Sequence, residues 1–141
     1  IASETLDDYE EGTYTHTITG DTSGSWTVRT GYTTLAYVKI GKMVTVTGQV
    51  ETSGTKTASG QVKISLPFTC SSGSQHGASA AFPLRGPGSS NPSTVFAFLS
   101  NNQNYFYLAA IADNGDLTLL DDSHLDSAWE GKLSLTYFTN A

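Results

Sequence analysis

Aromatic and amide side chains occur together at two places in the second half of the sequence. Tyr105 follows the amide-rich run Ser-Asn-Asn-Gln-Asn at residues 100–104, and Trp129 follows Asp126 in a polar segment. A flat aromatic ring can stack on the apolar face of a sugar while amides and carboxylates bond to its hydroxyls. The candidate ligand-binding residues are therefore Trp129, Tyr105, Asn101, Asn102, Asn104 and Asp126.

A place in the hydrophobic core is the alternative for each of these aromatic residues. Trp26 and Tyr107 lie inside segments that alternate between apolar and polar residues, so we expect both to be core residues. For Trp129 and Tyr105 the sequence leaves core packing and ligand binding open, because both lie beside polar residues.

Catalytic chemistry would need carboxylates or an activated nucleophile. Asp121, Asp122, Asp126 and Glu130 could supply the two carboxylates of a glycosidase. Such a pair must face a cleft at a set separation, and a domain of this size offers little cleft. No Gly-x-Ser-x-Gly nucleophile motif is present. We therefore expect a protein that is not an enzyme.

Metal binding is the next alternative. His16, His76 and His124 are far apart in the sequence, and the chain has a single Cys, so the spacing of a zinc site is absent. The candidates for a hard cation are Asp113, Asp116, Asp121, Asp122 and Asp126. They do not form the twelve-residue calcium loop, and turn and capping roles fit them better. We expect neither a metal nor a cofactor.

The charge of the chain limits its partners. The 141 residues carry a net charge of −6, which disfavours nucleic acid and anionic membranes as partners. Acidic residues gather at both ends, whereas the middle is mildly basic. The acidic residues either keep exposed termini and turns hydrated or contact the basic middle of a neighbouring subunit. No apolar run approaches the ~18 residues of a membrane span.

The N-terminal residues and the cysteine content add further expectations. Ile1-Ala2-Ser3 is not a signal peptide, and the absence of an initiator Met indicates part of a longer chain. The single Cys70 excludes an intrachain disulfide and fits folding in a reducing compartment.

Short alternating segments dominate the chain, and no segment sustains a helical period. About nine such strands at intervals of ~8–12 residues predict an all-β fold, an antiparallel β-sandwich that is jelly-roll-like. Residues 1–12 are expected to be an acidic arm or linker, and residues 13–141 the β-sandwich domain. Thr52–Gly60 is interpreted as a polar loop.

The segment Ala36–Val50 is expected to form the central hairpin, with its turn near Gly41. A plain two-residue turn would place Lys39 beside Val44 and mix the apolar and polar faces. An extra residue or bulge would instead pair Ile40 with Val44 and keep the apolar side chains together. We expect the bulged arrangement.

Three motifs resemble those of a known family. Leu6–Thr15 (Leu-Asp-Asp-Tyr-Glu-Glu-Gly-Thr-Tyr-Thr), Tyr37–Gly41 with the following Val44–Val50, and Ser65–Phe68 occur in this order. They resemble the "LDDYEEGT", "Y-x-K-I-G" and "LPF" motifs of C-terminal domains in bacteriophage tail-fibre and tailspike proteins. Leu133–Phe138 adds to the resemblance. Family members often have Trp and Pro at the positions of Tyr14 and His16.

The resemblance implies a homotrimeric domain in the distal part of a tail fibre or spike of the virion, folded in the host cytoplasm. It implies recognition of a bacterial surface polysaccharide or lipopolysaccharide, without nucleic acid or membrane insertion. It transfers no receptor-binding residue, because the loops at such tips vary. There are two alternatives. The first is a structural module that trimerises the fibre end, and the second, less favoured, is a glycan hydrolase.

Two apolar segments also favour a trimer. Thr94–Leu99 and Tyr105–Ala112 are apolar on both faces, and Phe96, Phe98, Phe106 and Leu108 exceed what one thin core needs. Soluble monomers keep exposed apolar patches to a few hundred Å². We expect these side chains to be covered by neighbouring subunits.

Overall fold

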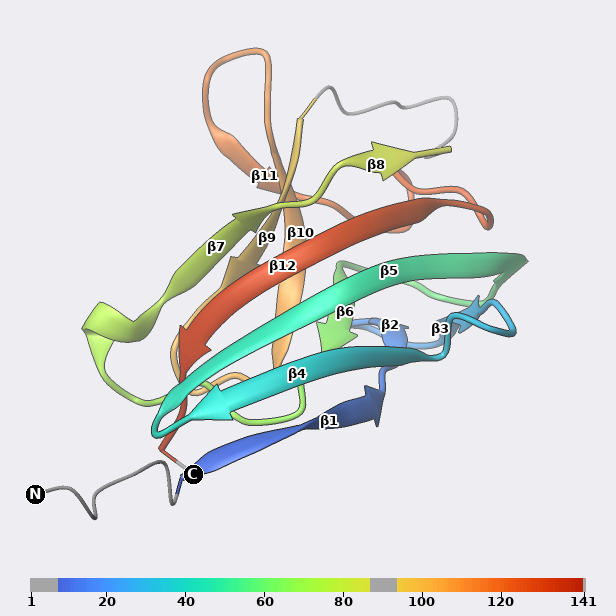
Figure 1. The fold of residues 1–141 in the computed structure, drawn as a ribbon. Coiled ribbons are helices and arrows are strands. Elements are labelled where there is room, and N and C mark those ends of the chain that lie inside the picture. Colours follow the sequence, from blue (N-terminus) through green and yellow to red (C-terminus); the bar gives the residue numbers. More distant parts are fainter. Residues whose placement is uncertain (1–7, 87–93, 141) are drawn as a thin grey trace, which may run out of the picture.

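In the computed structural model, which describes residues 8–86 and 94–140, the chain forms a curled antiparallel β-sandwich, as predicted (Figure 1). The strands are β1 (Tyr9–Thr15), β2 (Ile18–Gly20), β3 (Ser25–Val28), β4 (Thr34–Ile40), β5 (Met43–Lys56), β6 (Val62–Ser65), β7 (Ala78–Ala81), β8 (Leu84–Arg85), β9 (Val95–Leu99), β10 (Tyr105–Ile111), β11 (Leu117–Leu119) and β12 (Glu130–Phe138). The only helical element in the described ranges is one 3-10 turn, Ser74–His76. None of the described residues form a helix with the length and apolarity that a membrane span requires.

The strands form two layers. β1, β4, β5, β12 and β8 make the first layer, and β3, β2, β6, β10, β9 and β7 make the second, with β11 added beside β10. β5 belongs to both layers, because its first half pairs with β4 and β12 while its far end pairs with β3. Figure 1 shows β5 as the long strand that curves across the molecule. The predicted loop at Thr52–Gly60 is therefore wrong in its first half, where β5 continues to Lys56.

The central hairpin closes with the plain two-residue turn, so the expected bulge is wrong. Ile40 pairs with Met43 and Lys39 with Val44. Gly41 has φ 58°, the left-handed conformation that a tight hairpin turn requires. As a result, Val38 and Ile40 are on the outer face, 37% and 44% exposed.

A buried lysine explains why the hydrophobic pattern misleads at this hairpin. Lys39 is only 6% exposed, on the inner side of β4. Its Nζ is 6.0 Å from the centroid of the Phe68 ring and 4.0 Å from a carboxylate oxygen of Asp8. A long lysine side chain can bury its methylene groups and keep the ammonium near the surface. Lys39 can therefore occupy the inner face of β4, and its neighbour Ile40 then lies on the outer face.

The acidic N-terminal segment is partly a strand. Tyr9–Gly12 belong to β1 and pair with β4 from Ile40 to Tyr37. Residues 1–7 of the expected arm, including Leu6, lie outside the described residues. The division into an arm and a domain remains a prediction.

Four aromatic side chains join the two layers. Trp129 meets Trp26 edge to face at a centroid distance of 6.3 Å, and Phe82 at 6.4 Å. Phe82 is also 6.5 Å from Phe106. Trp26, Phe82 and Phe106 are at most 1% exposed. Trp26 is thus a core residue, as its alternating segment predicted.

Gly131 makes room for this aromatic cluster, so Gly131→Ala is expected to destabilise the fold. A Cβ at position 131 would lie 2.1 Å from Cε1 of Phe82, far inside van der Waals contact. Overpacking a well-filled core costs about 1–3 kcal/mol. Urea unfolding should report that loss. Gly77→Ala is the matched control, because its Cβ would meet only Leu99 O at 3.5 Å, and an equal loss there would contradict the explanation.

His16 is buried without partners, and this gives a pH-dependent stability. Its side chain is 2% exposed, and neither ring nitrogen has a hydrogen-bond partner among the described residues. Burial lowers the pKa of His16, partly offset by the backbone of Thr33. The unfolded chain therefore binds the extra proton more readily, and stability should fall as the pH drops below about 6.5.

The His16 contribution is measured by comparing the urea midpoints of wild type and His16→Leu between about pH 7.5 and 5. As the pH falls, the urea midpoint of wild type should decrease relative to that of His16→Leu. Parallel pH profiles for the two proteins would show that His16 does not titrate in this way.

Candidate functional site

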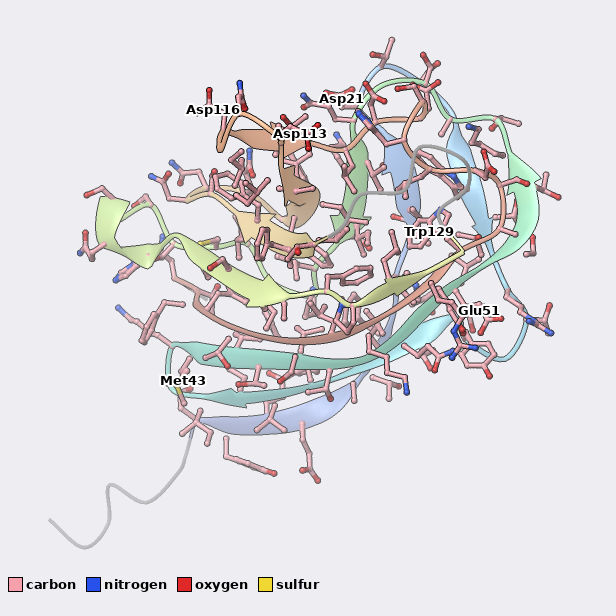
Figure 2. The ribbon with its side chains drawn as sticks, turned by 90° about the horizontal axis from the view of Figure 1, so that it is seen from above. Asp21, Met43, Glu51, Asp113, Asp116 and Trp129 are labelled. Atoms are coloured by element: carbon pink, nitrogen blue, oxygen red, sulfur yellow. The ribbon has the colours of Figure 1, made fainter. Side chains whose placement is uncertain are left out.

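A pocket of about 680 Å³ opens where the two layers meet at one end of the β5–β12 ladder. Its lining residues are Arg29, Thr30, Glu51, Thr52, Ser53, Arg85, Gly86, Ala128, Trp129 and Glu130. A second hollow of about 240 Å³ shares Arg85 and Glu130 with it and extends over Pro83 and Leu84. We call the two together the arginine–glutamate groove. Figure 2 shows Trp129 and Glu51 at this end of the molecule and Met43 at the other end of β5.

Strand register brings the charged residues of the groove together. Glu130 begins β12 and pairs with both Glu51 of β5 and Arg85 of β8. Arg29 follows β3 directly, and its backbone N–H donates to the carbonyl of Glu51 at 2.8 Å. Four segments far apart in the sequence thus contribute one side chain each.

An ordered network links these side chains. Gln49 Nε2 donates to Glu51 Oε2 at 2.9 Å and to Glu130 Oε2 at 3.0 Å. Arg29 Nη1 pairs with Glu51 Oε1, and Arg85 Nε pairs with Glu130 Oε1 at 2.8 Å. Three of the four carboxylate oxygens therefore accept a hydrogen bond, and the fourth, Glu130 Oε1, forms an ion pair with Arg85. The two arginines are 59% and 86% exposed at the side chain, so they form the outer rim of the network.

Trp129 forms part of the groove wall rather than an exposed stacking platform. The residue is 3% exposed, and its ring packs against Trp26 and Phe82. Its backbone N–H donates to Thr52 Oγ1 at 2.9 Å, and Thr52 Oγ1 donates to Ser127 O at 2.8 Å. The stacking role predicted for Trp129 is thus incompatible with its burial. Its indole N–H has no acceptor within the part of the chain that the structure describes.

The other predicted ligand-binding residues do not join Trp129. Asp126 is three residues before it, and its backbone carbonyl accepts a hydrogen bond from Trp26 Nε1 at 3.0 Å. Asn101 lines a hollow of about 380 Å³ and donates from Nδ2 to Ser72 O at 3.0 Å. Asn102, with φ 64°, lines another hollow of about 480 Å³.

Tyr105 begins β10 in the second layer, and Asn104 is the loop residue directly before it. The Asn104 carbonyl accepts from Leu66 N at 2.7 Å, which ties the loop to the strand end. The Tyr105 hydroxyl accepts from Gln103 Nε2 at 3.2 Å, and Lys63 Nζ lies 4.4 Å from the Tyr105 ring centroid. The predicted set is therefore spread over several surfaces and forms no single site.

Tyr105 belongs to a half-buried aromatic surface, which we call the aromatic face. It is the outer face of β9 and β10 and consists of Phe96, Phe98, Tyr105 and Tyr107. The core position predicted for Tyr107 is therefore wrong. Tyr105 and Tyr107 meet edge to face at 5.3 Å. The hydrogen bond with Tyr105, followed by burial and by the negative charges of Tyr105 and Asp21, raises the pKa of Tyr107 to about 12. Its hydroxyl is therefore neutral at physiological pH.

The outer face of the first layer carries a second apolar group at the end away from the groove. Tyr9 pairs with Ile40, Ile40 with Met43, and Met43 with Phe138, so the four side chains form one row across four strands. They are 39–46% exposed. Val38, two residues before Ile40, extends the row, and we call these five residues the apolar corner.

Among the candidate cation ligands, the carboxylates of Asp121 and Asp122 bond to backbone N–H groups of turns, the role that the sequence favoured. Asp121 Oδ1 accepts from Ser123 N at 2.8 Å, and Asp122 Oδ1 accepts from Gly60 N at 2.8 Å. Asp113 and Asp116 lie at the β10–β11 hairpin, away from the groove (Figure 2). Within residues 8–86 and 94–140, no group of three or more His, Cys, Asp or Glu side chains is arranged to hold a metal ion.

Glu130 was among the candidate carboxylates, but the rest of the network was missed because no sequence motif joins Arg29, Gln49, Glu51 and Arg85 to it. Glu51 is one of only two acidic residues between Gly12 and Ala112, and that rarity was an available signal. Its pairing with Glu130 depends on the register of β5 against β12, and Arg85 lies in a two-residue strand. Neither feature can be read from local periodicity.

Comparison with known proteins links the fold to a phage tail protein. No protein-family model matches the sequence, and no curated protein matches it. The structure is similar to the one described as "Crystal structure of Dettilon tailspike protein (gp208)", with a TM-score of 0.74 and 21% sequence identity. The match covers 92% of this chain and 24% of that chain. The chain thus has the fold of one part of a phage tailspike and spans about a quarter of that protein's length.

Proposed function

We propose that this chain is a non-catalytic host-recognition domain of a phage tail fibre or tailspike, which binds a bacterial surface glycan in the arginine–glutamate groove. The tailspike-like fold and the three motifs that resemble tail-fibre domains support a tail component in the virion. Its distal position on the fibre and its folding in the host cytoplasm belong to the same proposal.

The groove is the observation that carries glycan binding. Arg29 and Arg85 offer donors at its rim, Glu51 and Glu130 offer acceptors, and Pro83 and Leu84 add an apolar surface. A sugar ring presents hydroxyls around its edge and C–H groups on its faces, which matches this combination. The carboxylates are both tied to arginines and to Gln49, so the network holds a ligand in place instead of serving as an acid and base pair.

The test is binding of the 141-residue chain to an array of bacterial O-antigen and capsular glycans. We expect a restricted set of glycans to bind and no shortened products to appear. Arg29→Gln should weaken binding by about tenfold or more, because a hydrogen bond to a charged group contributes about 1.5–3 kcal/mol. Lys42→Gln makes the same charge change at the exposed hairpin turn and should have no effect. Binding to no glycan would refute the proposal, and product release would identify a hydrolase.

We further propose that the domain is a homotrimer, which is also the basis of the alternative function as a structural module. The apolar corner and the aromatic face lie on the outer faces of the two different layers. A three-fold ring joins subunits head to tail, so each subunit needs two different contact surfaces. These two apolar surfaces supply such a pair.

The interface residues differ from those inferred from the sequence. Phe106 and Leu108 are 0% exposed and belong to the core of their own subunit. Phe96 and Phe98 face outward and remain available to a neighbour. In sedimentation equilibrium we expect about three times the monomer mass of 14.9 kDa. A monomer would refute the trimer and, with it, the structural-module alternative.

A further inference from the structure

Three exposed cationic side chains line the arginine–glutamate groove: Arg29, Arg85 and Lys132. Its two carboxylates are more deeply placed, because the side chains of Glu51 and Glu130 are only 11% and 26% exposed. A ligand that enters the groove therefore meets positive charge first. From this arrangement we infer, building on the proposed function, that the groove selects an acidic glycan and binds its carboxylate or phosphate groups with the three cationic side chains.

The strand register places Lys132 on the same face as the two glutamates. Lys132 follows Glu130 by two residues on β12, and its cross-strand partner on β5 is Gln49, two residues before Glu51. Residues two apart on a strand share a face at a spacing of about 7 Å. Within the part of the chain that the structure describes, the Lys132 ammonium has no ion pair or hydrogen bond. It is therefore available to a ligand.

The hydrogen-bonding groups of the groove favour a ligand that accepts. Arg29 uses Nη1 and Arg85 uses Nε in their contacts with the glutamates, so further N–H groups of both guanidiniums remain for a ligand. On Arg85 both Nη groups remain, and this edge of a guanidinium can bind a carboxylate or phosphate through two parallel hydrogen bonds. The carboxylate oxygens of the groove, by contrast, are already engaged by the arginines and Gln49. An ionised carboxylate only accepts, which complements this excess of donors.

The negative charge of the chain lies mostly away from the groove. Three of the seven Lys and Arg residues are among the described lining residues, but only two of the thirteen Asp and Glu residues are. Asp113 and Asp116, for example, lie at the β10–β11 hairpin (Figure 2). Exposed charges more than about 8 Å apart are largely screened from each other at physiological salt. The local charge of the groove, and not the net charge of −6, therefore decides which glycan binds.

The experiment measures the affinity of the 141-residue chain for two matched pairs of glycans. One pair is a uronic-acid polysaccharide before and after chemical reduction of its carboxyl groups. The other is a phosphate-bearing polysaccharide before and after removal of its phosphate groups. We expect the acidic member of at least one pair to bind about tenfold more tightly than its neutral counterpart, because charge-assisted hydrogen bonds are about twice as strong as neutral ones. This preference should weaken several-fold between about 0.05 and 0.5 M salt.

Lys132→Gln tests the groove without disturbing the network, because the Lys132 ammonium takes no part in it. The variant should bind the acidic glycan about five- to tenfold more weakly and the neutral counterpart with unchanged affinity. Lys132→Arg keeps the charge and should retain the preference. Lys42→Gln makes the same charge change at the β4–β5 turn, and this matched control should change neither affinity.

Each result decides a different statement. Equal affinity for both members of each pair, or tighter binding of the neutral members, would overturn the selectivity and leave glycan binding intact. An equal loss from Lys42→Gln would overturn the role of the groove, because the effect would then come from net charge alone. Binding to no glycan of either kind would overturn both the selectivity and the proposed function. Thermal unfolding shows whether each variant is folded, and Arg85→Gln provides a second readout if Lys132→Gln is not.

Discussion

Replacing Trp26 with alanine is expected to lower the free energy of unfolding by about 3–5 kcal/mol, which is a large part of the stability of a domain of this size. Trp26 is 1% exposed and lies between the layers against Trp129. Its Nε1 donates to the carbonyl of Asp126 at 3.0 Å, and Lys56 Nζ lies 5.9 Å from its ring centroid. Truncation removes all of these contacts at once and leaves a cavity.

The measurement is urea unfolding followed by circular dichroism, with Tyr32→Ala as the control. Tyr32 is 37% exposed, so its truncation should change the free energy of unfolding by about 0.5 kcal/mol or less. Trp26→Phe should recover part of the loss, because a smaller ring keeps much of the contact with Trp129. A loss for Trp26→Ala no larger than that for Tyr32→Ala would show that the layers are not held together at this point.

Trp26 also illustrates what the sequence predicts well. It lies in a strand with regular alternation, and each of the main alternating segments became a strand. Successive side chains of a strand point to opposite faces of the sheet, and this alternation is a local property that the periodicity of the sequence reports directly. At β4 the alternation misleads, because the long amphipathic side chain of Lys39 occupies an inner position and reverses the apparent faces of the strand.

The groove lies outside what local patterns can predict. Its network depends on the register between β5 and β12, where the partners Glu51 and Glu130 are far apart in the sequence. It also depends on the extension of β5 to Lys56, in a segment whose polar residues suggested a loop. That polar segment becomes a strand because it pairs with a neighbouring strand, and no pattern within the segment indicates this pairing. Trp129 was found by residue type, but its burial could be seen only in the fold.

Replacing Met43 with glutamate is expected to convert the proposed trimer into monomers while leaving each subunit folded. Met43 is 39% exposed at the centre of the apolar corner, between Ile40 and Phe138. In a monomer the new carboxylate would remain solvated, so the cost to folding is small. In the trimer it would be buried without a partner, and an uncompensated buried charge costs about 3–5 kcal/mol for each interface. Three identical interfaces multiply this penalty.

Sedimentation equilibrium measures the change in mass, and Thr47→Glu is the control for added charge on the same face. Thr47 is exposed and pairs with Ala36 and Ser134, outside the apolar corner. Because Met43 and Glu51 are eight residues apart along β5, or about 27 Å, the groove should keep its intrinsic affinity in the Met43→Glu monomer. Binding to a surface crowded with glycans should nevertheless fall by about a hundredfold, since three linked sites act together only in the trimer. A Met43→Glu protein that remains trimeric would exclude the apolar corner from the interface, and the aromatic face would then need a different partner.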